Sequence, residues 1–306
     1  MPAPVLLDAQ SQNDLIRTGS ALVPFLDEAE VASLLEALSA LRTSAFPPST
    51  IVGQPLTYHS TALDSDADYR ARTFSVARDA AAPHIDRLLD GFEIATAGIL
   101  IKEPGTGSLG LHSDWTLTED PDGLAITIWC PLVDVDESNG CLHVVPGSHR
   151  LVRHVNGPGI KGYQGRFQQE LKERAVAVPM RAGEALVFDS SLLHGSPVNQ
   201  SAYNRPAIML TCVRRGCRPV FYINDAGSHG ADFQIFDLAD GGFVERPANE
   251  YFAGLATEKL VGRVPNTNDS LSPAGFRRRH ALARRWRRAF GTYEPRWIYR
   301  VLPGFS

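Results

Sequence analysis

The stretch LAITIWCPLVDVDESNGCLHVVPGSH, residues 124–149, holds two short apolar runs on either side of Asn139-Gly140. Runs rich in β-branched residues are typical of strands, and asparagine followed by glycine is a strong turn signal. We expect strands at the apolar runs 94–102, 124–133, 141–145, 175–179, 185–189 and 207–214. Many short strands between turns favour a sandwich or jelly roll, and the strand–helix alternation of a Rossmann sheet is missing.

Two amphipathic helices are expected before these strands. Residues 27–42 can start at Asp27 with Glu30 three positions later, which is the pattern of a capping box. A second helix is expected at 80–90. Between the strands expected at 141–145 and 175–179, the glycine-rich residues 150–170 predict a mobile loop that could cover a site. Residues 217–270 show no regular pattern.

The length of 306 residues suits one large domain, for which we expect a jelly-roll core at 94–215. A helical flank at 1–93 and an extension at 216–306 complete this organisation. The amino terminus lacks the pattern of a signal peptide, and no apolar run approaches the roughly 20 residues of a membrane span. Four cysteines without Cys-x-x-Cys spacing are expected to be reduced thiols, so a cytoplasmic protein is predicted.

Charge is unevenly distributed. Residues 277–288 hold seven of the 30 basic residues and no acid, so the rest of the chain carries 23 basic against 34 acidic groups, a net −11. This balance disfavours nucleic-acid binding by the body of the protein. Residues 276–290 predict a basic amphipathic helix, either docked on the body or facing an anionic partner such as a membrane surface or an acidic carrier protein.

A metal site is suggested by His112-Ser113-Asp114 and the later His194. Residues two apart on an extended strand point to the same side, so His112 and Asp114 can converge. Two histidines and one carboxylate leave open positions on a metal, which suits non-haem Fe(II) oxygenases. Arg205 follows His194 by eleven residues. Its planar guanidinium would hold the distal carboxylate of a 2-oxo acid that chelates the iron.

With these residues the sequence resembles the phytanoyl-CoA dioxygenase family of Fe(II)/2-oxoglutarate-dependent oxygenases. The resemblance covers about residues 95–215 and rests on His112-Ser113-Asp114-Trp115, Thr127-Ile128-Trp129-Cys130-Pro131-Leu132, the segment from Asn139 to His149, and His194-Gly195-Ser196 with Arg205. It implies a mainly β protein with flanking helices, whose core is a double-stranded β-helix of the cupin-like, jelly-roll kind.

The resemblance also implies roles for individual residues. His112, Asp114 and His194 match the iron ligands, and the 2-oxoglutarate contacts would be Arg205, Ser196, Trp129, Thr127 and Lys102. Many relatives have glutamine at the position of Ser113, so the sequence departs from the family pattern there. Related halogenases lack the carboxylate ligand, and the presence of Asp114 therefore argues against halogenation.

Other residues near these motifs have two interpretations. Trp115 and Thr116 follow the expected iron ligand and could face the substrate, as could Tyr58 and His59, although packing explains all four as well. We interpret His143 and His149 as structural.

The predicted function is hydroxylation of an unactivated C–H bond in a small organic metabolite, such as an amino-acid derivative, an acyl compound or a natural-product intermediate. Fe(II), 2-oxoglutarate and O₂ would take part, with release of succinate and CO₂. The same centre could instead desaturate, epimerise or close a ring, or act on a protein side chain. A scaffold without turnover and a cupin-type isomerase or hydrolase are the rival classes. Oligomeric state is not predicted.

Overall fold

The computed structural model describes residues 4–41, 49–51, 54–120, 123–152, 154–238, 241–268 and 272–279. The α-helices are α1 (Ala9–Thr18), α2 (Glu28–Leu41), α3 (Ala67–Leu88), α4 (Gln168–Lys172) and α5 (Ala248–Phe252). Short 3₁₀ helices are η1 (Thr61–Leu63), η2 (Ser148–Arg150), η3 (Tyr163–Arg166), η4 (Ala226–Ser228) and η5 (Thr257–Lys259). The strands are β1 (Ser20–Pro24), β2 (Thr50–Ile51), β3 (Gln54–Pro55), β4 (His59–Ser60), β5 (Phe92–Lys102), β6 (Leu109–His112), β7 (Ala125–Pro131), β8 (Leu142–Val144), β9 (Val176–Val178), β10 (Glu184–Asp189), β11 (His194–Ser196), β12 (Arg205–Arg214), β13 (Val220–Asn224), β14 (Asp232–Asp237) and β15 (Leu260–Pro265).

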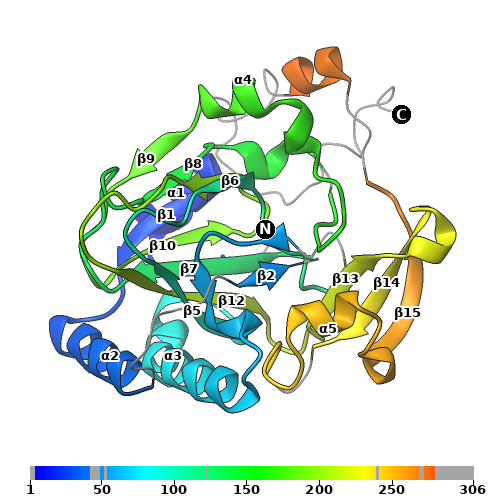
Figure 1. Cartoon of the computed structure of the whole chain (residues 1–306). Helices are drawn as coiled ribbons and strands as arrows, with labels where there is room; N and C mark the ends of the chain where they lie inside the picture. Colours follow the sequence, from blue (N-terminus) through cyan, green and yellow to red (C-terminus); the bar gives the residue numbers. More distant parts are fainter. Residues whose placement is uncertain are drawn as a thin grey trace.

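Two antiparallel sheets form the centre of the molecule (Figure 1). The larger has the strand order β1-β10-β7-β12-β5-β4, and the smaller has the order β6-β11-β8-β9. Apolar side chains from both, among them Trp129 and Phe188 of the larger and Leu142 and Val144 of the smaller, share one core cluster. The predicted double-stranded β-helix is therefore confirmed, together with the strands expected from the apolar runs.

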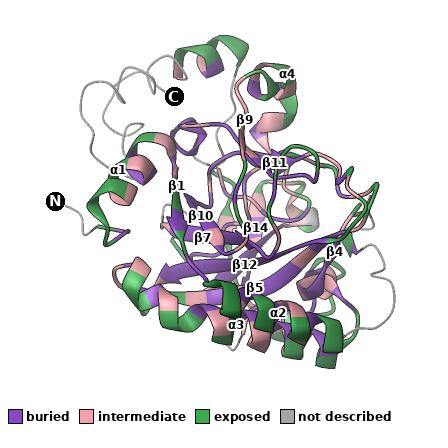
Figure 2. Cartoon of the chain, turned by 90° about the vertical axis from the view of Figure 1, so that its left-hand side faces the viewer, coloured by how far each residue is buried: buried purple, intermediate pink, exposed green. Residues whose placement is uncertain are grey.

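The larger sheet is covered on both faces. Its inner face meets the smaller sheet, and α2 and α3 pack on its outer face, with their exposed sides turned to solvent (Figure 2). Every residue of β7 is buried as a result. A strand covered on both faces reads as a continuous apolar run, which explains the pattern Ala-Ile-Thr-Ile-Trp-Cys-Pro. Ile126 and Ile128 point to the helices, whereas Trp129 contacts the inner cluster.

The helix expected at 27–42 is α2, and its capping box is present. The backbone N–H of Glu30 donates to Asp27 Oδ1 at 2.8 Å, and the N–H of Asp27 donates to Glu30 Oε2 at 2.8 Å. The helix expected at 80–90 is α3, and its predicted start was wrong, since α3 begins at Ala67. Pro83 lies inside it. A stripe of buried residues from Tyr69 to Ile85 keeps the helix on the sheet despite the hydrogen bond that proline cannot donate.

Residues 217–270 were expected to be irregular, and that expectation was wrong. They contain a third antiparallel sheet, β13-β14-β15, which is coloured yellow to orange in Figure 1. Phe221 and Phe236 of this sheet join Tyr251 of α5 in a buried cluster. The strands are short and interrupted by glycine and asparagine, so packing of aromatic side chains and not periodicity fixes their place.

The expected loop at 150–170 is packed over much of its length. It contains η3 and the start of α4, and Leu151, Tyr163 and Phe167 are buried in one cluster. Phe276 stacks on Phe167 with ring centroids 4.1 Å apart. Residues 273–279 are helical, whereas 280–290, where most of the basic helix is expected, lie outside the described residues. Among the helices that the structure describes, none has the length and apolar character needed to cross a membrane.

Candidate metal and cosubstrate site

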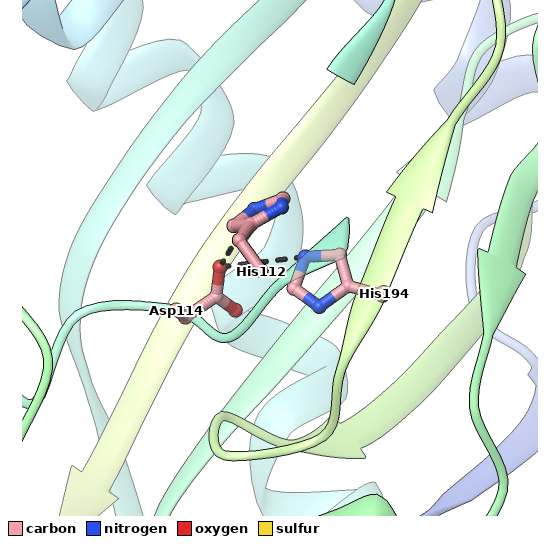
Figure 3. A group of neighbouring side chains, drawn as sticks. All are labelled: His112, Asp114 and His194. Carbon is pink, nitrogen blue, oxygen red and sulfur yellow. Dashed lines mark ion pairs between the residues drawn. The ribbon is translucent and has the colours of Figure 1, made fainter. Parts of the chain in front are cut away.

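Two neighbouring strands of the smaller sheet bring three potential ligands together (Figure 3). His112 ends β6 and lies directly opposite His194, the first residue of β11. Asp114 follows β6 by two residues, and its Oδ1 lies 4.0 Å from His112 Nε2 and 3.5 Å from His194 Nε2. The three ligand atoms lie within 4.8 Å of one another. The sequence-predicted set therefore meets at one point in space.

Backbone carbonyls fix which ring nitrogen of each histidine faces this point. His112 Nδ1 lies 2.9 Å from Gly110 O, and His194 Nδ1 lies 3.0 Å from Leu192 O. A carbonyl can only accept, so each Nδ1 carries the proton and each Nε2 keeps a free lone pair. Burial, followed by the neighbouring imidazole of His194, lowers the pKa of His112 and favours its neutral form. Two neutral imidazoles and one carboxylate fit Fe(II) with open coordination positions.

Thr127 donates a hydrogen bond to the Asp114 carboxylate. Its Oγ1 on β7 donates to Asp114 Oδ2 at 2.5 Å and also lies 2.9 Å from Ser190 Oγ. The backbone N–H of Asp114 donates to Ser190 O at 2.8 Å. Thr127 is not among the described residues that line the cavity, so it contacts the expected metal ligand instead of the cosubstrate pocket. Its effect on a metal would be to orient the carboxylate.

A cavity of about 270 Å³ opens beside the three ligands and ends at two buried cations. Arg205 and Lys102 are register partners on β12 and β5, and each is only 2% exposed. Burial lowers the pKa of Arg205 to about 10. Its guanidinium lies 5.1 Å from the centre of the Trp129 ring, and its Nε and Nη1 have no hydrogen-bond partner among the described residues. Like charges opposite each other in a sheet repel, so this end of the cavity needs an anion.

The Lys102 side chain is closely surrounded where it reaches the cavity. Its Nζ donates to Ser196 Oγ at 2.7 Å and to Pro197 O at 2.6 Å. Gly107 has φ +90°, and a Cβ there would lie 2.4 Å from Lys102 Cδ. A Cβ on Gly140 would lie 3.0 Å from Nζ. Burial, followed by the charge of Arg205, lowers the pKa of Lys102 to about 7.

The structure separates the remaining predicted residues into two groups. Trp115 and Tyr58 line the cavity, and burial raises the pKa of Tyr58 to about 12, so its hydroxyl stays protonated. Thr116 does not line it, and its Oγ1 accepts from the backbone N–H of Asn156 at 3.0 Å. His59 is 2% exposed and lies 3.7 Å from Asp64, also away from the lining.

The two histidines interpreted as structural lie outside the ligand group. His143 Nε2 is 4.0 Å from Glu137 Oε1. His149 packs against the glycine that ends α1, because a Cβ on Gly19 would lie 2.3 Å from its Nδ1. The φ of Gly19 is +92°, so glycine satisfies both the turn and the close approach.

Several lining residues were missed by the sequence reasoning. They form the wall far from the two cations and comprise Leu63, Arg70, Phe74, Phe243 and Val244. None belongs to a motif, and Phe243 lies in the region that showed no pattern. The adjacent Gly241-Gly242 is the one local signal of a sharp turn that could carry a side chain into a site.

Comparison with known proteins identifies the family. The phytanoyl-CoA dioxygenase (PhyH) family model matches residues 17–207, more than half of the chain, so the chain belongs to this family. The phytanoyl-CoA dioxygenase of Arabidopsis thaliana is 33% identical over 125 residues, which cover 39% of this chain and 44% of that protein. The ectoine dioxygenase of Nocardia farcinica is 30% identical over 131 residues, which cover 35% and 43%. The matched stretches span less than half of these relatives.

A solved structure with the same fold is the non-heme alpha ketoglutarate dependent carbocyclase SnoK from nogalamycin biosynthesis. The TM-score is 0.50 at 20% identity, over 72% of this chain and 89% of that chain. This similarity concerns the fold. The family resemblance predicted from the sequence is therefore confirmed.

Proposed function

We propose that the protein is an Fe(II)/2-oxoglutarate-dependent dioxygenase that hydroxylates a C–H bond of a small organic molecule. The observation that carries the proposal is the buried, unpartnered face of Arg205 in the same cavity as His112, Asp114 and His194. A metal site alone would suit many reactions, whereas a buried cation beside it calls for a carboxylate cosubstrate.

Each side chain has a task in this proposal. His112 and His194 would hold the metal through Nε2, and Asp114 would neutralise part of its charge. Arg205 and Lys102 would bind the distal carboxylate of 2-oxoglutarate, with Trp129 supporting the guanidinium. Bound iron would supply the oxidising chemistry, in which 2-oxoglutarate and O₂ are converted to succinate and CO₂ as the substrate is oxidised.

The walls of the cavity favour a small molecule over a protein side chain. They are built from the inner faces of β5, β7 and β12, together with Trp115 and Phe243. The pocket therefore lies between the sheets and not along an open groove. Desaturation, epimerisation and ring closure would use the same protein groups, so the hydroxylation outcome depends on how the substrate is placed.

The test is an anaerobic titration of metal-free protein with Fe(II) and then 2-oxoglutarate, followed by visible absorption. Bidentate binding of the keto acid should produce a weak charge-transfer band, and the band should be lost in Asp114→Ala. Binding of Fe(II) without any band would reject the cosubstrate assignment. Failure to bind Fe(II) would reject the metal assignment and favour a scaffold.

A further inference from the structure

The cavity has a second end whose chemistry is opposite to that of the cosubstrate end. There the lining comes from three separate parts of the chain: Leu63 of η1 and Phe74 of α3, Trp115 beside the expected metal ligand, and Phe243 of the segment that follows β14. The family model ends at residue 207, so Phe243 belongs to a part of the chain that the family match does not cover.

The aromatic side chains of this end are held rigidly. The Trp115 ring lies 5.0 Å from Phe221 and 5.5 Å from Phe243, the latter in an edge-to-face contact. Phe221 and Phe243 are themselves 5.0 Å apart and nearly perpendicular. Tyr251 of α5 packs behind both. Interlocked rings of this kind keep one fixed surface toward a ligand.

One charged side chain, Arg70, lines this end among the described residues, and it is occupied by the protein itself. Its Nε donates to Val244 O and its Nη2 to Glu245 O, both at 3.1 Å. Its Nη1 donates to Asp64 O at 2.7 Å and to Ser65 O at 3.1 Å. The residue is 3% exposed. Arg70 therefore braces the segment of Phe243 against the start of α3, with four of its five N–H groups used.

Two polar lining residues at this end, the register partners Thr96 and Thr211, carry hydroxyl groups. Hydroxyl groups can bond to a hydroxyl or carbonyl of a ligand, but they do not compensate a charge. A charged ligand would have to leave water for a wall of rings and aliphatic side chains. The one charged member of this wall among the described residues, Arg70, already donates to four backbone carbonyls, so the loss of hydration would not be compensated. A neutral ligand with one or two polar groups meets no such penalty.

We propose that this end binds a neutral, largely apolar organic molecule and places a flat ring of it against Trp115 and Phe243. The identity of this molecule as the substrate rests on the proposed function, because the same cavity leads to the metal ligands. The specificity-determining residues are then Trp115, which lies within the family match, and Phe243, which lies beyond it.

The test compares two probes with the same ring system, 2-naphthol and 2-naphthoate. Calorimetric titrations are made anaerobically with Fe(II) and saturating 2-oxoglutarate, so that the cationic end is already filled. Neutral 2-naphthol should bind at least roughly tenfold more tightly than 2-naphthoate. Equal or tighter binding of the carboxylate, or no detectable binding of 2-naphthol, would overturn the proposal.

Two matched variants locate the binding site. Phe243→Leu removes a ring from the wall and should weaken 2-naphthol binding by roughly three- to tenfold. Phe236→Leu removes a ring from the same aromatic cluster without touching the cavity lining, and should change it by less than about twofold. Equal effects of both would refute a contact with Phe243. If Phe243→Leu does not fold, Phe243→Trp, which narrows the cavity, should also weaken binding.

The outcome is separable from that of the proposed function. If the charge-transfer band is absent but 2-naphthol still loses affinity in Phe243→Leu, the binding site stands and the cosubstrate assignment fails. In that case the two probes are compared in the double variant Arg205→Ala/Lys102→Met, where 2-naphthoate can no longer use the cationic end. If the band appears but 2-naphthol does not bind, the dioxygenase assignment stands and the substrate class is rejected.

Discussion

The two ends of one cavity differ in almost every property. One end contains His112, Asp114, His194, Arg205 and Lys102, all within or next to the stretch matched by the family. The other is built largely from rings and aliphatic side chains, including Phe243 from outside that stretch. The two ends are therefore lined by different groups of side chains, and each group can be altered on its own.

The largest effect is expected from Asp114→Ala. The site would lose its one carboxylate, so affinity for Fe(II) should fall by more than roughly a hundredfold, since even groups behind the ligands contribute 10–100-fold. Iron content after anaerobic reconstitution and gel filtration measures this. Glu119→Ala, at an exposed position five residues later, is the control. Unchanged iron content in Asp114→Ala would remove the metal from this end.

Arg205→Ala should weaken 2-oxoglutarate binding next most strongly. The loss of a buried ion pair corresponds to about 3 kcal/mol, or roughly a hundredfold in Kd. The dissociation constant is read from the charge-transfer band. Arg214→Ala is a matched control, because Arg214 lies at the other end of β12 with its guanidinium 4.7 Å from the Phe92 ring. Equal losses in the two variants would mean that Arg205 acts through the strand and not through a carboxylate.

Thr127→Val tests the support of Asp114. Valine keeps the shape but removes the hydroxyl that donates to Oδ2, so Fe(II) affinity should fall by about tenfold or somewhat more. Thr211→Val, opposite it on β12, is the control and should leave metal affinity unchanged. A normal metal affinity in Thr127→Val would show that the carboxylate needs no such orientation.

Binding of 2-oxoglutarate should depend on pH through Lys102. Burial, and then the charge of Arg205, lowers the pKa of this lysine to about 7, whereas a bound carboxylate favours the protonated amine. Affinity should therefore be highest below pH about 7 and fall as the pH rises, by at most about tenfold per unit. Measurement from about pH 6 to about pH 9 should give a flatter profile in Lys102→Met. Identical profiles would exclude Lys102 as the titrating group.

The smallest effect is expected when the apolar end is altered and the charged end is measured. Phe243→Leu should leave the Kd values for Fe(II) and 2-oxoglutarate within about twofold of the wild type, because separated sites behave additively. Both values are read from the charge-transfer band, with Fe(II) varied at saturating 2-oxoglutarate and then 2-oxoglutarate varied at saturating Fe(II). A large change in either Kd would show that the two ends of the cavity are coupled and do not act independently.

Sequence reasoning reached the charged end because its residue types are rare and their spacing has a geometric meaning. His112 and Asp114 stand two apart, and Arg205 begins a readable strand. The aromatic wall gave no such signal, since a phenylalanine suits any core and its partners lie far away in the sequence. Phe243 meets Trp115 only because β13–β15 fold back on the loop after β6.

The starts of the helices α2 and α3 also differ in how well the local sequence predicts them. The capping box made the start of α2 predictable, because Asp27 and Glu30 act on each other across three residues. The start of α3 at Ala67 was missed although Asp66 caps it. Its polar first turns and Pro83 weaken the local signal, and the burial of Phe74 against the sheet compensates. Local rules therefore work where the stabilising contacts are local.

The pairing of His112 with His194 joins parts of the chain that are 82 residues apart, and β5 with β12 spans a still longer interval. Folds dominated by such long-range pairings assemble slowly. A metal bound by His112 of β6 and His194 of β11 would cross-link these two strands reversibly in the folded protein. At a free concentration of a hundred times its Kd it would add about 2.7 kcal/mol to the free energy of unfolding. The lifetime of this protein in a cell should therefore depend on iron supply, since a metal-starved cell would hold the less stable, more easily degraded form.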